Sequence, residues 1–423
     1  MNIVVVGAGI SGTVTALTLA RDGHHVQLVE RADAAATGAS FANAGLISPG
    51  HSFSWAEPGI TRVALRSLLR SNDGLGICAP WKPALLRWAW LFAREGSLER
   101  WLDNSRAALA LAAYSRDLQF GDPLVPPQAY GGRQAGILYL YGNEAQPGQH
   151  DAELLAAAGE PFETVDTTRL VDIEPMLRTA SAQFANAIYC PMDGTGDAAR
   201  YAHTALAEAA RLGAVVRFSE TVRTLKTRGD RIVGVETERG CLQADAVVIA
   251  TGLASRQLLA PLGYDLPIYP VTGYSISYTG VHDASPRVGA VSIPHKIAWA
   301  SFAPEAVRFT GFADIGKPSA QRIAMRMAAL EGFAANICAR LSRVQPSRWV
   351  GYRPMTPDNL PFLGATRHAN LWLNCGHGAM GWTMACGSAR TVADLISNRQ
   401  PVLDPSPYRW DRYRLLGRRQ QHA

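Results

Sequence analysis

The sequence predicts a two-domain α/β fold, in which a domain with a parallel sheet is joined to an α+β domain with an antiparallel sheet. Three observations indicate it. The chain opens on MNIVVVGAGISG and returns to a glycine-rich turn near its end, in NLWLNCGHGAMGWTMACGSA. Residues 263–348 alternate like antiparallel strands and become helical at 318–342. At 423 residues the chain is long enough for two sizeable cores.

The N-terminal turn has the residue pattern that a dinucleotide phosphate requires. Ile3 to Val6 form a short apolar run suited to a buried parallel strand. Gly7, Gly9 and Gly12 follow in G-x-G-x-x-G spacing. Gly7 permits the tight turn, Gly9 lets the backbone approach a pyrophosphate, and Gly12 lets the next helix pack closely on the strand. The amides and dipole of that helix favour phosphate charge.

A second strand, Val26 to Val29, completes this Rossmann-like unit and ends in Glu30, whose carboxylate can accept hydrogen bonds from ribose hydroxyls. A lone G-x-G-x-x-G can be only a tight strand–helix turn. Here the strand, the helix, the second strand and Glu30 follow one another at the spacing of a dinucleotide-binding fold, which favours nucleotide binding. The expected contacts are Gly7, Ala8, Gly9, Ile10, Ser11, Gly12, Glu30 and Arg31.

The C-terminal turn has a similar pattern. Leu371 to Leu373 form a predicted strand, a glycine-rich turn follows, and a helix is expected from Gly381 onward. A chain that begins a site at residue 7 and completes it near residue 380 holds a long ligand. The sequence therefore predicts FAD. The alternative is an ordinary strand–helix turn.

The segments between the two turns predict how the domains are divided. A strand is expected at Ile137 to Tyr141, a hairpin at Thr221 to Thr237, and an apolar strand in DAVVIATG, residues 245–252. We expect residues 1–50, 191–262 and 349–423 to form the FAD-binding domain. Residues 51–190 and 263–348 would form the substrate domain, with the active site at the interface.

Composition narrows the function classes. The chain has 41 basic and 35 acidic residues and is 48% hydrophobic, as in a soluble globular protein. The mild basic excess suits an anionic cofactor, a carboxylate substrate or an anionic membrane surface, and no basic motif indicates nucleic acid. The six cysteines lack metal-ligand spacing and favour a reducing compartment. Without a signal peptide or a membrane-spanning apolar run, we expect a cytoplasmic protein with no metal site.

Residues 81–101 hold four of the ten tryptophans together with basic residues. An amphipathic helix of this kind could lie at a bilayer interface. Packing on its own domain or on a partner subunit is the favoured alternative.

Three segments, GYRPMTPDNLPFLGAT (351–366), SFANAGLISPG (40–50) and GHGAMGWTMACGSARTVADLI (376–396), together resemble the D-amino-acid dehydrogenase small-subunit family. This family is a branch of the D-amino-acid oxidase and glycine oxidase group of flavoproteins. The resemblance spans essentially the whole chain and is weakest at 60–190 and 280–345, where substrate choice would be decided. It implies oxidative deamination of D-amino acids to 2-oxo acids and ammonia. A hydride would pass to flavin N5 and the electrons to a quinone or respiratory carrier.

Three alternatives stay open at this point. The first is a hydroxy-D-proline dehydrogenase or a glycine oxidase-like enzyme. The second is a flavin subunit that depends on partner proteins. The third is a plain NAD-dependent dehydrogenase, which leaves the C-terminal turn unexplained.

The resemblance also implies roles for single residues. In the broader group the arginine of a G-x-R-P motif holds the substrate carboxylate, and Arg353 occupies that position, where a planar guanidinium can bind it bidentately. Its alternative role is an ion pair with a residue such as Asp358. Further candidates at the pocket are Tyr274 and His51. A less specific set is the run of His295, Lys296 and Trp299.

Flavin contacts are implied in the loop after the first βαβ unit, at two strand ends and in the C-terminal turn. The amides of that turn would stabilise negative charge at N1–C2=O of the flavin. The similar sarcosine oxidase branch attaches its flavin through a cysteine in the segment around Gly351. This chain has no cysteine there, so the resemblance implies non-covalent FAD. The expected contacts are Ser40, Asn43, Ala44, Gly45, Leu46, Val222, Thr251, Gly252, Gly378, Met380, Gly381, Trp382 and Thr383.

Overall fold

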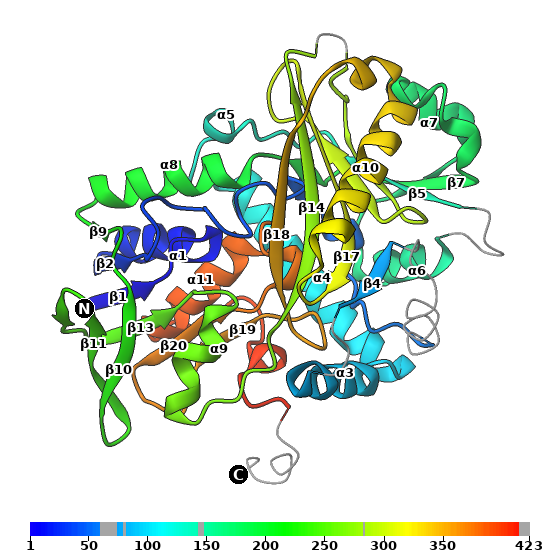
Figure 1. Cartoon of the computed structure of the whole chain (residues 1–423). Helices are drawn as coiled ribbons and strands as arrows, with labels where there is room; N and C mark the ends of the chain where they lie inside the picture. The colour runs from blue at the N-terminus through cyan, green and yellow to red at the C-terminus, as the bar shows by residue number, and fades with distance from the viewer. Residues whose placement is uncertain (60–73, 79–81, 143–147, 282–283, 414–423) are drawn as a thin grey trace.

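The computed structural model describes residues 1–59, 74–78, 82–142, 148–281 and 284–413. Two large sheets organise these residues, one with six strands and one with nine (Figure 1). The chain passes between the two sheets several times, so each is built from segments far apart in the sequence.

The six-stranded sheet has the order β19-β20-β13-β1-β2-β9 and is parallel except for β19. Its inner strands are almost continuously apolar because both faces are covered. The predicted strands at residues 3–6, 26–29, 245–252 and 371–373 all belong to it. The strands are β1 (Asn2–Val6), β2 (His25–Val29), β9 (Val215–Arg217), β13 (Ala246–Ile249), β19 (Phe362–Ala365) and β20 (Leu371–Cys375).

Helices cover one face of this sheet, and a small sheet covers the other (Figure 1). On the first face α1 (Ile10–Arg21) packs between α8 (Ala198–Arg211) and α11 (Ala385–Ile396), and α4 (Leu98–Gly121) packs on α11. On the second lie β10 (Val222–Arg228), β11 (Arg231–Thr237), β12 (Gly240–Leu242) and α9 (Ala254–Leu259). The predicted hairpin at 221–237 is β10 and β11.

The nine-stranded sheet has the order β18-β14-β17-β16-β15-β5-β7-β6, with β4 paired to β17. It is antiparallel except at β15–β5 and β17–β4. The helix α10 (Ala320–Ile337) packs on β14 and β17. The strands are β4 (Leu75–Ile77), β5 (Ile137–Tyr141), β6 (Glu163–Val165), β7 (Asn186–Cys190), β14 (Tyr269–Thr279), β15 (Gly289–Ser292), β16 (Ile297–Ala300), β17 (Ala306–Ile315) and β18 (Ser347–Met355).

The strand β18 corrects one predicted boundary. We expected residues from 349 onward to join the FAD-binding domain, but β18 pairs with β14 along its whole length, from Ser347 to Met355. The chain therefore returns to the six-stranded sheet only after Met355. The remaining elements are α3 (Pro83–Glu95), α5 (Pro127–Tyr130), α6 (Gln149–Ala158), α7 (Thr167–Ile173), and the small pair β3 (Leu46–Ile47) and β8 (Gly194–Thr195).

The tryptophan-rich segment is largely packed within the chain. Trp88 on α3 is buried and donates to the carbonyl of Met355, and Trp101 on α4 is buried and donates to that of Ser54. Trp90 is 52% exposed. Trp81 lies outside the described residues. None of the helices in the described ranges has the length and apolar character needed to cross a membrane.

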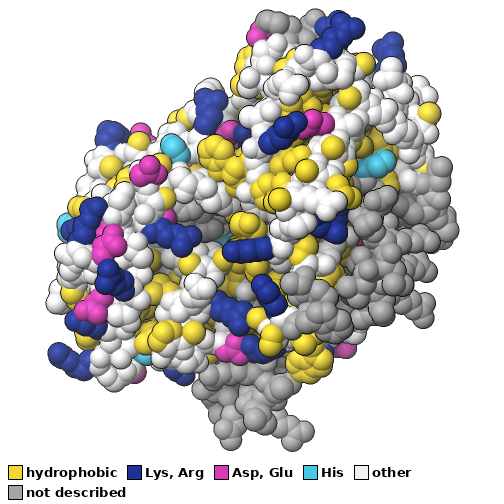
Figure 2. Space-filling model, viewed as in Figure 1, with side chains coloured by type: hydrophobic (Ala, Val, Ile, Leu, Met, Phe, Trp, Pro, Cys, Tyr) yellow, Lys and Arg dark blue, Asp and Glu magenta, His cyan; other side chains and the backbone are white. Residues whose placement is uncertain are grey.

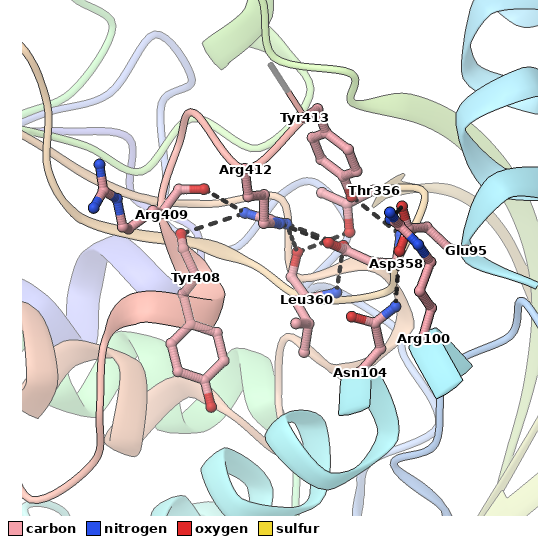
Figure 3. Close-up of polar contacts among 10 residues, drawn as sticks. All are labelled: Glu95, Arg100, Asn104, Thr356, Asp358, Leu360, Tyr408, Arg409, Arg412 and Tyr413. Carbon is pink, nitrogen blue, oxygen red and sulfur yellow. Dashed lines mark hydrogen bonds and ion pairs between the residues drawn. The ribbon is translucent and has the colours of Figure 1, made fainter. Parts of the chain in front are cut away.

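The last described residues are fastened to the loop that follows β18 (Figure 3). Arg412 binds Asp358 through two contacts, Nε to Oδ2 at 2.6 Å and Nη2 to Oδ1 at 3.0 Å. It also donates to the carbonyl of Leu360 at 2.7 Å. Asp358 is thus fully engaged by Arg412.

On the face in Figure 2, Lys and Arg side chains lie among acidic and hydrophobic ones and gather into no single basic patch.

Candidate active site

A cavity of about 1780 Å³ lies between the two sheets. Its walls include the carboxyl ends of β1, β2, β13 and β20 on one side and strands β14 to β5 of the larger sheet on the other. Pockets for small ligands typically measure about 300–1,000 Å³. This cavity therefore has room for a long ligand and a second, smaller one.

The N-terminal glycine turn forms one end of the cavity, and its backbone tolerates no side chains at two positions. Gly7 has a φ of +104°, and a Cβ there would lie 2.7 Å from the carbonyl oxygen of Ala250. A Cβ on Gly12 would lie 1.9 Å from the oxygen of Gly7. Gly12 is the one predicted cofactor residue that does not line the cavity. It acts through helix packing, as its position in the motif predicts.

Glu30 is held beside this turn. Its Oε2 accepts from the amide of Ala8 at 2.7 Å, and its Oε1 accepts from that of Ala32 at 2.9 Å. Ser40 caps the same turn, because its Oγ accepts from the amide of Ile10 at 3.0 Å. The carboxylate thus stands at the carboxyl end of β2, where an adenosine ribose is bound in nucleotide folds.

The C-terminal turn forms another part of the cavity wall, and its local structure differs from the predicted one. The helix does not start at Gly381. A 3-10 turn spans Gly378–Met380, residues 381–384 continue as turn, and α11 begins at Ala385. The amide of Met380 is used internally, by the carbonyl of His377. Among the described residues, the amides of Gly381, Trp382 and Thr383 donate to no protein acceptor, and all three residues line the cavity.

His377 links the two glycine turns. Its Nδ1 lies 3.4 Å from Ser11 Oγ at the start of α1, and its Nε2 lies 3.1 Å from Ser388 Oγ in α11. Burial lowers the pKa of His377 to about 3, so the imidazole stays neutral. Sequence reasoning missed this residue, because a histidine between two glycines carries no local signal of its contacts.

All other residues predicted to bind the cofactor line the cavity. They are Gly7, Ala8, Gly9, Ile10, Ser11, Glu30, Arg31, Ser40, Asn43, Ala44, Gly45, Leu46, Val222, Thr251, Gly252, Gly378, Met380, Gly381, Trp382 and Thr383. An elongated cavity with a glycine turn and an acid at one end and three open amides in another wall fits FAD.

Arg353 projects into the cavity from β18 without a carboxylate partner among the described residues. Its Nη1 donates to the carbonyl of Phe312 at 2.8 Å. The proposed alternative partner, Asp358, is taken by Arg412. Burial lowers the pKa of Arg353 to about 10, which leaves the guanidinium charged at neutral pH. An unpaired cation in a cavity is a binding site for an anion such as a carboxylate.

Two backbone features place this guanidinium. A Cβ on Gly273 of β14 would lie 2.5 Å from Arg353 Nη2. The guanidinium therefore occupies space that is free only because residue 273 has no side chain. Phe312 on β17 has a φ of +61°, at a register shift opposite Gly273. Its amide donates to the carbonyl of Lys296, which also has a positive φ, of +56°. Left-handed backbone at non-glycine residues costs free energy and is concentrated at functional sites.

Tyr274 does not reach the cavity, which corrects its predicted role. It follows Gly273 on β14, and alternate residues of a strand face opposite sides. Its hydroxyl donates to Asp314 Oδ2 at 2.5 Å, and Asp314 also binds Arg326. Arg326 in turn lies 4.6 Å from the centre of the Phe312 ring. Tyr274 therefore belongs to a buried network behind the site and cannot touch a substrate.

His51 lies in the cavity wall, as predicted. Its Nδ1 is 3.5 Å from Asp151 Oδ2. Lys296 also lines the cavity, but His295 and Trp299 do not: His295 binds Ser292, and Trp299 is buried in the core. The cavity is also lined by residues that the sequence did not reveal, among them Tyr139, Tyr141, Asp151, Gly273, Phe312 and His377.

Comparison with known proteins adds independent information. Residues 2–395 match the family model described as DAO, FAD dependent oxidoreductase. A D-amino acid dehydrogenase from Cereibacter sphaeroides is 39% identical, covering 100% of this chain and 98% of the relative. A D-amino acid dehydrogenase 2 from Mesorhizobium japonicum is 37% identical, covering 96% and 98%. The crystal structure of glycine oxidase from Geobacillus kaustophilus superposes with a TM-score of 0.70 at 22% identity, over 97% of this chain and 98% of that one.

Proposed function

The chain belongs to the DAO family of FAD-dependent oxidoreductases, and we propose that it oxidatively deaminates D-amino acids. The guanidinium of Arg353, which has no carboxylate partner in the described ranges, is the observation that carries the proposal. It lies inside a cavity that both glycine turns also line. The names of the relatives from Cereibacter sphaeroides and Mesorhizobium japonicum support D-amino acids as the substrate class.

Arg353 would bind the substrate carboxylate through paired hydrogen bonds, which fix both its position and its orientation. Gly273 and Phe312 hold the guanidinium in place, so the entropy of positioning is lost before the substrate arrives. The substrate reacts with its α-amine neutral, and it loses a hydride from Cα and a proton from the amine nitrogen. Water then hydrolyses the imine to a 2-oxo acid and ammonia. Bound FAD supplies the two-electron acceptor.

The residues at both glycine turns would hold that cofactor without a covalent bond. The turn at Gly7 to Ser11 would take the pyrophosphate and Glu30 the ribose. The amides of Gly381, Trp382 and Thr383 would face negative charge on the flavin. We propose that residues 1–50, 191–262 and 356–423 form the cofactor domain, with the start of its last segment adjusted to the end of β18.

We further propose that the electrons leave to an acceptor other than oxygen, such as a quinone, because both named relatives are dehydrogenases. The chain would work in the cytoplasm, with exposed Trp90 and Leu86 of α3 as the contact to a membrane or partner subunit.

An anaerobic visible spectrum of the purified protein tests the proposal. D- and L-amino acids and proline derivatives are added in turn, and the flavin band is followed. We expect D-amino acids alone to bleach it, and oxygen not to restore it quickly. Arg353→Gln should keep the flavin but lower kcat/KM about 100- to 1,000-fold, because a charge-assisted bidentate pair is lost. A flavin that no D-amino acid bleaches would overturn the substrate class.

A further inference from the structure

A second polar cluster lines the cavity, away from Arg353. Tyr139 and Tyr141 lie two residues apart on β5 and so project from the same face of the sheet. Both line the cavity, as do His51 and Asp151. None of these four residues has a part in the function proposed above.

Hydrogen bonds fix this cluster. Tyr141 donates to Asp151 Oδ2 at 2.6 Å, and His51 Nδ1 lies 3.5 Å from the same oxygen. Tyr139 donates at 2.5 Å to Asp193 Oδ2, which also accepts from the amide of Gly50, next to His51. The carboxylate of Asp151 and the backbone next to His51 are therefore both held from β5.

One carboxylate oxygen of Asp151 is available to accept a hydrogen bond from a ligand. Its side chain is 17% exposed, and its Oδ1 accepts no hydrogen bond from any described residue. Burial alone would raise the pKa of Asp151, but its contact with His51, the hydrogen bond from Tyr141 and the charge of Lys296 bring the pKa below its usual value. The carboxylate is therefore ionised at neutral pH, and its Oδ1 is left without a donor within the described part of the chain.

The sheet gives the distance between this cluster and the carboxylate site. Phe312, which holds Arg353, is on β17, and Tyr141 is on β5, three strands further along the order β17-β16-β15-β5. Neighbouring strands lie about 4.8 Å apart, so the backbones of Phe312 and Tyr141, which hold the two side chains, are separated by roughly 14 Å. The α-amine of an amino acid is attached to the same carbon as its carboxylate. The cluster is therefore too far away to bind the α-amine and faces the end of the substrate side chain.

We propose that Asp151 forms a distal subsite for the cationic end of an unbranched substrate side chain. The proposal rests on the function proposed above and names its substrate class: D-amino acids of lysine or arginine length. Six bonds separate the carboxyl carbon from the terminal nitrogen of lysine, which is about 7.5 Å at roughly 1.25 Å of advance per bond. A hydrogen bond of about 2.9 Å at each end brings the span close to the separation of the two sites.

The other charges at this end favour a cation over an anion. Glu57 and Asp151 are the carboxylates in this part of the wall, and Lys296, His51 and His150 are the basic groups. Lys296 is exposed, so solvent screens its charge more than that of the largely buried Asp151. An ammonium at Asp151 Oδ1 meets a preformed acceptor, whereas a carboxylate there meets a like charge.

Binding of unreactive carboxylates to the FAD-loaded protein tests the subsite without turnover. Calorimetry compares 6-aminohexanoate, which has a carboxylate and a cationic end, with hexanoate, which lacks the cation. We expect 6-aminohexanoate to bind about tenfold more tightly to the wild type, equivalent to about 1.4 kcal/mol. Asp151→Asn keeps the size and an acceptor for Tyr141, and should abolish the difference. Glu153→Gln is the control, because Glu153 is on the same helix, 59% exposed, and outside the cavity wall.

Turnover distinguishes the two proposals. D-lysine and its neutral analogue D-norleucine are compared, with D-alanine as a short substrate. We expect Asp151→Asn to lower the kcat/KM ratio of D-lysine to D-norleucine about tenfold and to leave D-alanine unchanged. Oxidation of D-alanine without a preference for D-lysine, or a preference for D-2-aminoadipate, would overturn the subsite alone. Failure to oxidise any of these D-amino acids would overturn the proposed function, while the calorimetric difference would still report on Asp151.

Discussion

The position of the Arg353 guanidinium depends on the absence of a single methyl group, and Gly273→Ala adds it. The new Cβ would lie 2.5 Å from Nη2 and 2.6 Å from Cζ of Arg353, and its three nearest atoms all belong to that guanidinium. Ordinary contact between such atoms is about 3.5 Å, so the guanidinium must move by about 1 Å. The end of a flexible side chain can make this movement without disturbing the sheet.

We expect this change to separate function from stability. A displacement of about 1 Å in a positioning group can cost about 100-fold in rate, so kcat/KM for D-alanine should fall by about that factor. The hydrogen bond to Phe312 would be strained as well. Gly273 does not have a positive φ, so alanine fits the backbone and the melting temperature should stay within a few degrees.

The assay combines steady-state kinetics, flavin content and thermal unfolding. Gly332→Ala is the matched control: Gly332 is in α10, and nothing lies within 4 Å of its added Cβ. Its kinetics should equal those of the wild type. If Gly273→Ala binds flavin and has wild-type kcat/KM, Arg353 does not have to be where the structure places it, and the reasoning is refuted.

Three further changes test other parts of the structure. Arg412→Ala should lower the free energy of unfolding by about 3–5 kcal/mol, because Asp358 is left buried without its partner. Removing the largely exposed Arg409 should change the free energy of unfolding by no more than about 0.5 kcal/mol. Denaturant titration measures both. Burial raises the pKa of Asp193 to about 7 from 3.8, so its protonated form stabilises the fold at low pH and this contribution is lost as pH rises to about 7. The melting temperature of the wild type relative to Asp193→Asn should therefore fall between pH 4 and 7, and a constant difference would contradict this. Glu30→Gln should weaken FAD binding roughly tenfold in a fluorescence titration of apoprotein, and unchanged affinity would exclude a role for the charge.

The turns were predictable from the sequence because their requirements are local. Gly12 is required by a contact within one strand–helix unit, and Gly7 is required by the positive φ of the turn itself. Glu30 binds that turn from the end of the next strand. Arg353 was found through a motif of four residues. The family and the FAD cofactor predicted from these features are confirmed by the match over residues 2–395.

The errors and omissions have physical reasons. Tyr274 was misassigned because a shift of one residue along a strand changes the face, and the cavity-facing residue is its neighbour Gly273. The start of α11 was placed too early, because glycines that allow a helix also allow a looser turn. Asp151 could not be found at all, since its contact with His51 joins two segments about a hundred residues apart.

The division of the six-stranded sheet also sets a condition on how the protein is made. The strand β20, which pairs with β13, and the amides of residues 381–383 all come from the last part of the chain. While a ribosome is still translating that part, β13 has an unpaired edge that can associate with other chains. If the amides of residues 381–383 bind the flavin as proposed, the flavin cannot be fully enclosed until residues 371–383 have left the exit tunnel.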